Sequence, residues 1–235
     1  MSLPEGAGPP EGAGRPAGRY RQIRFVAPPG SAALLLVRHG ESESADVDRP
    51  FLLVDGHGDP ALAPEGRIQA EAVCGRLAAE GVDAVVVTSL RRTAETAAPL
   101  LARLGLEPAV ERDLREVHLG EWEGGAYRQK VIEGDPLARE VFERQRWDAI
   151  PGAESNEAVA ARVRGAIERI AAAHADRRVA VFAHGGTIGT VLALASGSEP
   201  FAFVGADNGS ISEVVVGPER WVVRRYNDIA HLVGY

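Results

Sequence analysis

Three short apolar runs of the chain each end in polar residues that could handle phosphate. The run LLLV leads directly into Arg38 and His39, and the run VVV leads into a segment that contains Arg91 and Arg92. A third run, VAVFA, leads into His184. An Arg beside a His is out of place inside a strand, but it suits the end of a strand that faces a ligand. The pattern therefore indicates a binding site at the ends of several strands.

Together these residue types suggest phosphoryl transfer. Two planar guanidinium groups could hold a phosphate dianion. A neutral imidazole can attack phosphorus and carry the phosphoryl group, while a second imidazole stabilises the charge of the transition state. Glu116, which follows a further strand-like run, supplies a carboxyl group that could protonate the leaving oxygen. Because the arginines and the second imidazole do the neutralising, we expect neither a metal ion nor a cofactor.

Strands that alternate with helices must position these side chains. The apolar patterns predict strands over 34–37, 85–87, 108–112 and 178–183, helices over 64–80, 92–104, 155–173 and 187–195, and a hairpin from 210–216 and 221–225. The alternation predicts a three-layer α/β/α sandwich with a largely parallel central sheet. Ligands of such sheets bind beyond the carboxyl ends of the strands, where the polar residues above would converge.

The chain divides into a tail and one domain. Residues 1–30 are rich in Gly and Pro and predict a flexible tail, while 31–235 predict a single domain. Residues 126–150 are charged, aromatic and helical in pattern, with no strand beside them, so we interpret them as an excursion from the sheet. Either they cap the crevice and contact the leaving group of the substrate, or they form a solvated face; the residues concerned are Tyr127, Arg128, Lys130, Arg144, Arg146 and Trp147.

Composition narrows the function classes. The net charge of −7 disfavours a nucleic-acid-binding surface. The single cysteine, Cys74, excludes a disulfide framework within the chain and is interpreted as a small core residue. No apolar run is long enough to span a membrane, and the first residues do not resemble a signal peptide. We expect a cytoplasmic protein that binds neither nucleic acid nor membrane.

Four segments, in order, resemble the motifs of the histidine phosphatase superfamily, also called phosphoglycerate mutase-like. Arg38-His39-Gly40-Glu41-Ser42 is similar to its RHG signature, and the other three are TSLRRTAETA (88–97), LREVHLGEWEG (114–124) and VFAHGG (181–186). The similarity runs from about residue 33 to the end of the chain. RHG alone is a weak signal, but four motifs that each follow a predicted strand are a strong one.

The resemblance implies a role for each matched residue. His39 would be the nucleophile that becomes phosphohistidine, and Arg38, Arg92 and His184 would bind the phosphoryl group. Glu116 would act as general acid for the alcohol and then as base for water. The implied fold is the phosphoglycerate mutase-like sandwich with a helical cap insertion.

Two departures from the family pattern bear on function. Many relatives have an Asn three residues after the Ser or Thr of the RHG motif, where this chain has Ala45. The mutases usually carry Gly-Trp-x-Asp before the first helix, whereas this chain has VDGHGDPALAPEG. We therefore expect a metal-independent phosphomonoesterase acting on a small phosphorylated metabolite. A cofactor-dependent phosphoglycerate mutase is the alternative, and a catalytically inactive phosphate-binding protein is disfavoured because all five matched residues are present.

Other polar residues leave alternatives open. Ser42 and His118 are candidate substrate-pocket residues, although His118 also fits a surface loop. His57, between Asp55 and Asp59, could suggest a metal ligand, but such loops are usually turns, and we predict no metal site. The exposed edges of the predicted hairpin permit a homodimer without requiring one.

Overall fold

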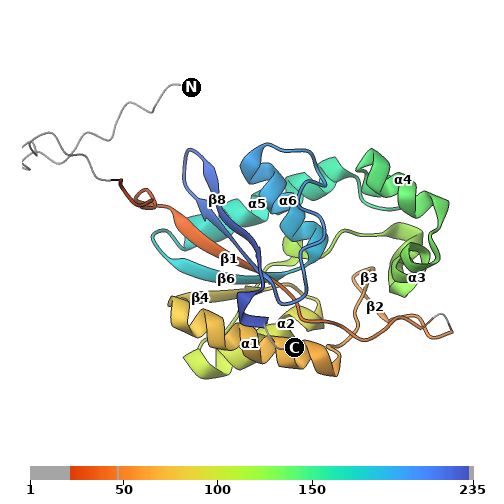
Figure 1. Ribbon diagram of the computed structural model, residues 1–235, viewed down its shortest axis with the longest axis horizontal. Coiled ribbons are helices and arrows are strands. Elements are labelled where there is room, and N and C mark those ends of the chain that lie inside the picture. Colours follow the sequence, from red (N-terminus) through yellow and green to blue (C-terminus); the bar gives the residue numbers. More distant parts are fainter. Residues whose placement is uncertain (1–21, 47, 233–235) are drawn as a thin grey trace, which may run out of the picture.

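The computed structural model describes residues 22–46 and 48–232. Its main sheet has the strand order β5-β4-β6-β1-β7-β8 (Figure 1). These strands are β1 (Ala32–Arg38), β4 (Ala84–Val87), β5 (Ala109–Val110), β6 (Arg178–Ala183), β7 (Ile211–Val216) and β8 (Trp221–Asp228). The first four strands of this order run parallel to one another, and β7 runs antiparallel to both of its neighbours, β1 and β8. The prediction of a largely parallel central sheet is confirmed.

Helices cover both faces of the sheet, which confirms the three-layer sandwich. α1 (Pro64–Glu80) and α2 (Arg91–Leu104) lie on one face, and α5 (Asn156–Ala173) and α6 (Gly185–Ser196) lie on the other (Figure 1). Alternate side chains of β1 enter the two cores. Leu34 and Leu36 pack on the side of α5 and α6, whereas Leu35 and Val37 pack on the side of α1 and α2. A strand buried on both faces needs an uninterrupted apolar run, and LLLV provides it.

Local signals fix the ends of the helices. Pro64 occupies the first turn of α1, and Gly81 ends that helix with a φ of 74°, a conformation that glycine adopts without strain. The Ser155 side chain caps α5 by accepting a hydrogen bond from the Ala158 N–H at 3.2 Å. Asn156, the first residue of α5, donates its side-chain amide to the Gln145 carbonyl.

The parallel register brings the ends of the central strands together. Arg38, the last residue of β1, pairs with Ala183, the last residue of β6, so that His39 and His184 follow at the same level. The His39 N–H donates to the Ala183 carbonyl at 3.1 Å, which extends the ladder by one step. β4 lies on the other side of β6. The three polar segments that follow these strands therefore meet at one edge.

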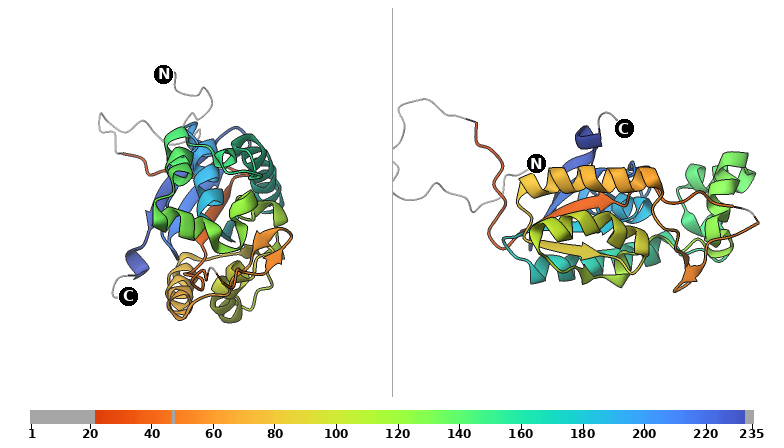
Figure 2. Two further views of the ribbon diagram at one scale, coloured as in Figure 1. Left: turned by 90° about the vertical axis from the view of Figure 1, so that its right-hand side faces the viewer. Right: turned by 90° about the horizontal axis from the view of Figure 1, so that it is seen from below.

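The excursion forms two short helices beyond this edge. α3 (Ala126–Glu133) and α4 (Pro136–Arg144) lie at the end of the molecule towards which β1 runs (Figure 2). Gly134 ends α3 with a φ of 70°, and the Asp135 side chain accepts from the Leu137 N–H to begin α4. Short 3-10 turns precede and follow the pair at Gly120–Gly125 and Trp147–Ala149.

A small hairpin lies beside the excursion, where the sequence predicts only a turn. It consists of β2 (Leu53–Val54) and β3 (His57–Gly58), joined by Asp55 and Gly56. Both linking residues have positive φ, 49° and 82°, as the two-residue turn of a tight hairpin requires. An Asp-Gly pair such as Asp55-Gly56 is typical of this kind of hairpin turn.

The predicted tail lies mostly outside the described residues, which begin at 22. Residues 22–28 form no helix or strand and are exposed. None of the helices in the described part of the chain is both long enough and apolar enough to cross a membrane.

We predict opposite effects for two Gly→Ala substitutions in α1. A Cβ at Gly66 would lie 2.0 Å from the Glu41 carbonyl oxygen, whereas a Cβ at Gly75 would meet nothing within 4 Å. Gly66→Ala is therefore expected to lower the free energy of unfolding by about 2 kcal/mol or more. Gly75→Ala should raise it by up to about 1 kcal/mol, because Ala favours the helix. Urea unfolding of both variants makes the comparison, and equal effects would contradict the close packing of α1 on the loop after β1.

Candidate active site

Two adjoining cavities lie beyond the carboxyl ends of β1, β4 and β6. The larger has a volume of about 650 Å³ and the smaller about 230 Å³. They share a wall of five residues, namely Arg38, His39, Glu123, Gly125 and Arg128. Arg92 and Glu116 line the smaller cavity, and Ser42 lines the larger. The structure thus brings five of the sequence-predicted residues, from three separate segments, to one place.

His39 is held in one tautomer by two hydrogen bonds. Its Nδ1 lies 2.7 Å from the Gly40 carbonyl oxygen, which can only accept, so Nδ1 carries the proton. Its Nε2 accepts from the Arg92 Nε–H at 3.2 Å. Burial, followed by the neighbouring charges of Arg92 and Arg38, holds the pKa of His39 well below its usual range. The ring is therefore neutral at neutral pH, with its lone pair on Nε2.

The loop that carries His39 is fixed from three sides. The Gly40 N–H donates to Thr96 Oγ1 at 3.0 Å, from α2. The Glu41 N–H donates to Gln69 Oε1 at 2.8 Å, from α1. The Asn208 side-chain amide donates to the His39 carbonyl at 2.9 Å. These contacts leave the imidazole little freedom to move.

Two buried guanidinium groups flank His39. Arg92 donates from Nη1 to the Gly58 carbonyl at 2.9 Å, and Asp59 lies 3.9 Å away. Burial lowers the pKa of Arg92 to about 10, so the group stays charged at neutral pH. Arg38 donates from Nη1 to the Ala206 carbonyl, and burial also lowers its pKa. The Arg38 Nε is buried without a hydrogen-bond partner among the described residues.

His184 lies beside His39 and is fully buried. The two ring centroids are 5.2 Å apart, with the rings at 61° to each other. Its Nε2 lies 3.0 Å from Thr88 Oγ1, at the end of β4, while its Nδ1 has no partner in the described part of the chain. Burial, with the charge of Arg92 as the next cause, holds the pKa of His184 well below its usual range.

The N-terminus of α6 holds the carboxylate of Glu116. Backbone N–H groups of Gly186 and Thr187 each donate to it at 3.2 Å, and that of Val117 donates at 3.0 Å. A helix N-terminus favours a negative charge in this position. A Cβ at Gly186 would lie 2.7 Å from Glu116 Oε1, so glycine is needed there for the approach.

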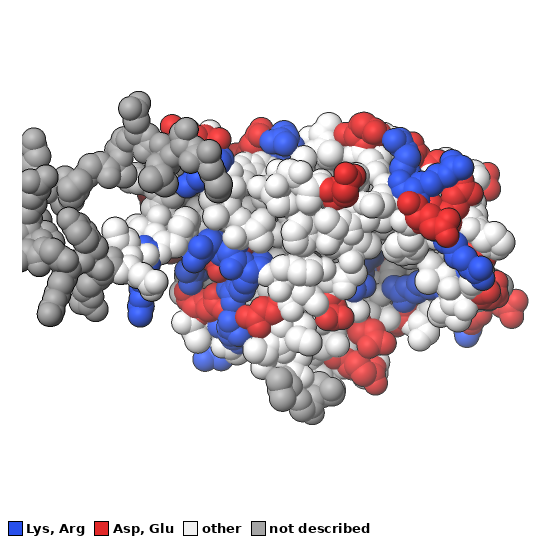
Figure 3. Space-filling model, turned by 45° about the horizontal axis from the view of Figure 1, so that its top comes forward, with Lys and Arg blue, Asp and Glu red and all other residues white. Residues whose placement is uncertain are grey.

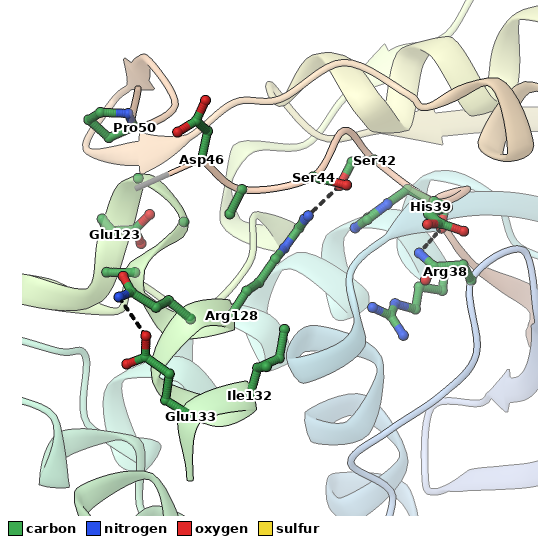
Figure 4. A pocket seen from close by; sticks show the side chains of 17 residues that line it. Arg38, His39, Ser42, Ser44, Asp46, Pro50, Glu123, Arg128, Ile132 and Glu133 are labelled. Carbon is green, nitrogen blue, oxygen red and sulfur yellow. Dashed lines mark hydrogen bonds between the residues drawn. The ribbon is translucent and has the colours of Figure 1, made fainter. Parts of the chain in front are cut away.

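Arg128 of α3 joins the excursion to the loop after β1. It donates from Nη2 to Ser42 Oγ at 2.6 Å and from Nη1 to the Glu43 carbonyl at 2.8 Å. Figure 4 shows its side chain reaching across the larger cavity, with Arg38 and His39 beyond. Burial and the charge of Arg38 lower the pKa of Arg128. For this residue the structure favours a cap over a solvated face.

Aromatic side chains close the smaller cavity, which is lined by Phe51, Trp122, Tyr127 and Trp147. Ala45, which lines the larger cavity, faces Gly125; a Cβ at Gly125 would lie only 2.8 Å from the Ala45 Cβ. Because Ala45 and Gly125 are both small, the backbone at the start of α3 can approach the loop after β1.

Other predicted residues lie outside the cavities or make structural contacts. His118 lines neither cavity; its ring packs edge-on against His57, which lines the smaller cavity, with centroids 5.3 Å apart. In residues 22–46 and 48–232, no group of three or more His, Cys, Asp or Glu side chains could hold a metal ion. His231 Nε2 donates to the Gly209 carbonyl at 2.9 Å, which ties the segment that follows β8 to the loop before β7.

Charges of both signs are interspersed over the face drawn in Figure 3. In the smaller cavity, by contrast, three positively charged side chains lie around His39, namely Arg38, Arg92 and Arg128.

Comparison with known proteins agrees with this arrangement. Residues 34–229 match the model of the histidine phosphatase superfamily (branch 1). The chain belongs to the histidine phosphatase superfamily. It is 34% identical over 206 residues to phosphoglycerate mutase-like protein 4 of Arabidopsis thaliana, covering 86% of this chain and 87% of that one. It is 30% identical over 204 residues to the metal-independent phosphoserine phosphatase of the same plant, covering 85% and 82%.

Solved structures of this superfamily have the same fold. A mycobacterial glucosyl-3-phosphoglycerate phosphatase in complex with inorganic phosphate superposes with a TM-score of 0.69 at 32% identity, over 85% of this chain and 98% of that one. The phosphoglycerate mutase of Bacillus anthracis superposes with a TM-score of 0.71 at 22% identity, over 87% and 96%, and shows the fold alone. Superfamily members of this kind are phosphatases or mutases, so the protein is an enzyme.

His39 and His184, the two most deeply buried histidines, predict how stability depends on pH. Unfolding raises the pKa of His39 and His184 to about 6.5, so below that pH the unfolded chain binds protons that the folded chain does not. The free energy of unfolding should therefore be constant above about pH 7 and fall as the pH drops further, by up to about 1.4 kcal/mol per pH unit for each histidine. Urea unfolding between about pH 7.5 and 5 measures the slope. His184→Gln should reduce it, and a slope unaltered by that substitution would contradict the assignment.

Proposed function

We propose that the protein is a metal-independent phosphomonoesterase that acts through a phosphohistidine on a small phosphorylated metabolite. The observation that carries this proposal is the state of His39, a neutral ring with a fixed Nδ1–H and a lone pair on Nε2 between two buried guanidinium groups. Such a ring is a nucleophile aimed at an anion-binding site.

In the first half-reaction, the phosphoryl group lies against Arg38, Arg92 and His184. The buried atoms without partners, Arg38 Nε and His184 Nδ1, supply contacts for its oxygens. The Arg92 Nε–H, which now points at His39 Nε2, turns to a phosphoryl oxygen and frees the lone pair. The N–P bond forms, the P–O bond to the alcohol breaks, and protonated Glu116 gives its proton to the leaving oxygen.

In the second half-reaction, water replaces the alcohol. The carboxylate of Glu116 takes a proton from this water as its oxygen attacks phosphorus. The N–P bond breaks, inorganic phosphate forms, and His39 recovers its lone pair. Glu116 is thereby returned to the protonated form that begins the next cycle, so acid and base are one residue.

Hydrolysis is favoured over mutase chemistry by the larger cavity. It has a volume of about 650 Å³, adjoins His39 and includes several polar side chains in its lining, so it has room for water beside the phosphoenzyme. A mutase must protect that intermediate from water. The phosphatases among the relatives, for phosphoserine and for glucosyl-3-phosphoglycerate, support the same choice. A cytoplasmic location, expected from the sequence, belongs to this proposal, and the hairpin edges permit a homodimer without requiring one.

A panel of phosphomonoesters assayed in EDTA tests the reaction class. We expect phosphate release from several esters by the wild-type protein and none by His39→Ala. Conversion of 3-phosphoglycerate to 2-phosphoglycerate in the presence of a bisphosphate primer, without phosphate release, would instead assign the mutase reaction. No reaction of either kind would contradict the proposal.

The role of Glu116 predicts a dependence on the leaving group. p-Nitrophenolate can leave without being protonated, whereas the serine oxygen of phosphoserine must be protonated as it leaves. Glu116→Gln should therefore still release a burst of p-nitrophenolate, equal to the amount of enzyme, and accumulate phosphohistidine because water is no longer activated. With phosphoserine the first step itself should slow by about 100-fold or more. Rapid-quench kinetics distinguish the two, with His39→Ala, which should show no burst, as control. A normal burst with both esters would remove Glu116 from proton transfer.

A further inference from the structure

His57 occupies an unusual position in the β2–β3 hairpin, because both of its ring nitrogens face backbone carbonyl oxygens. Nδ1 lies 3.1 Å from the Asp55 oxygen, and Nε2 lies 3.1 Å from the Glu116 oxygen. Carbonyl oxygens only accept, so each contact is a hydrogen bond only when the nitrogen concerned carries a proton. The side chain is buried, which makes these contacts part of the packed structure rather than of the surface.

Of the two contacts, only the second joins separate parts of the molecule. The Asp55 contact lies within the turn of the hairpin itself. The Glu116 contact connects the hairpin to the segment that carries the predicted general acid, 59 residues further along the chain. The main chain of Glu116 also accepts from Arg162 Nη2 at 3.1 Å. Its side chain is held separately by the N-terminus of α6.

The same hairpin also orients the phosphate-binding arginine. The Gly58 carbonyl accepts from Arg92 Nη1 at 2.9 Å, and the Gly58 N–H donates to Glu123 Oε2 at 2.8 Å. Neighbouring residues of one short strand thus contact Arg92 and Glu116, which must act on opposite ends of the same P–O bond. The hairpin sets the spacing between the two groups.

We propose that His57 is a positioning residue for proton transfer, donating from Nε2 to the backbone of Glu116 and so fixing the height of its carboxyl group in the smaller cavity. The inference rests on the proposed function, since it concerns the step in which the alcohol leaves. His57 does not touch the reacting atoms. It acts through Glu116, and its loss affects the protonation of the leaving group more than the attack on phosphorus.

Two variants separate this role from a merely structural one. His57→Leu removes the donor and keeps an apolar side chain in the buried site. His57→Gln keeps an amide N–H at about the place of Nε2. With phosphoserine, His57→Leu should lower kcat by about tenfold or more, while the burst rate with p-nitrophenyl phosphate should change by less than about threefold. His57→Gln should restore most of the activity on phosphoserine.

Two controls accompany these measurements. Inhibition by inorganic phosphate reports on the Arg92 site, and its inhibition constant should stay unchanged in both variants. Leu53→Gln alters an exposed residue on the partner strand of the hairpin and should leave the ratio of the two substrates unchanged.

The outcomes are distinct. Equal losses on both substrates, or no restoration by Gln, would overturn the positioning role while leaving the phosphatase assignment in place. A wild-type protein that hydrolyses neither ester would overturn the proposed function, and the role of His57 with it.

Discussion

The hydrogen bond from Arg92 to His39 Nε2 is the contact on which the site depends. It can form only if the imidazole is neutral and its proton is on Nδ1, and the Gly40 carbonyl ensures that tautomer. It also requires Arg92 to be aimed by the Gly58 carbonyl. The tautomer, the loop after β1 and the hairpin are consequently parts of one arrangement. A change in any of them alters the lone pair that would attack phosphorus.

This arrangement has an energetic cost that the fold must offset. Two guanidinium groups and two imidazoles are removed from water, and burial opposes charge on all four, as their lowered pKa values show. The histidines respond by staying neutral. The arginines stay charged and donate their hydrogen bonds to carbonyl oxygens, while Asp59 lies 3.9 Å from Arg92 without a hydrogen bond to it. Positive charge is therefore kept available for an incoming anion instead of being neutralised by the protein.

Much of the fold and of the site could be predicted from the sequence. The LLLV run predicted a strand buried on both faces, and the alternation of elements predicted the layers. Parallel pairing then required that the residues after β1 and β6 meet, so His39 and His184 could be placed together. Contacts that depend on how loops cross in space could not be read from spacing. The Arg128 bond to Ser42 and the His57 contact with Glu116 join segments 86 and 59 residues apart, and His118, close to Glu116 in sequence, turned away from both cavities. Only the Asp-Gly turn of the hairpin was a local signal that could have been used.

The use of the α6 N-terminus has a consequence for how the site responds to its surroundings. Its N–H groups, which in many proteins cradle a phosphate, here bind a carboxylate. In the proposed reaction, attraction for the phosphoryl group therefore falls to the side-chain cations of Arg92, which is buried, and of Arg38, which is largely buried. Charges in such a position are screened far less than those on a surface. Affinity for phosphate should consequently vary little with ionic strength, unlike that of a protein that captures anions with exposed lysines or arginines.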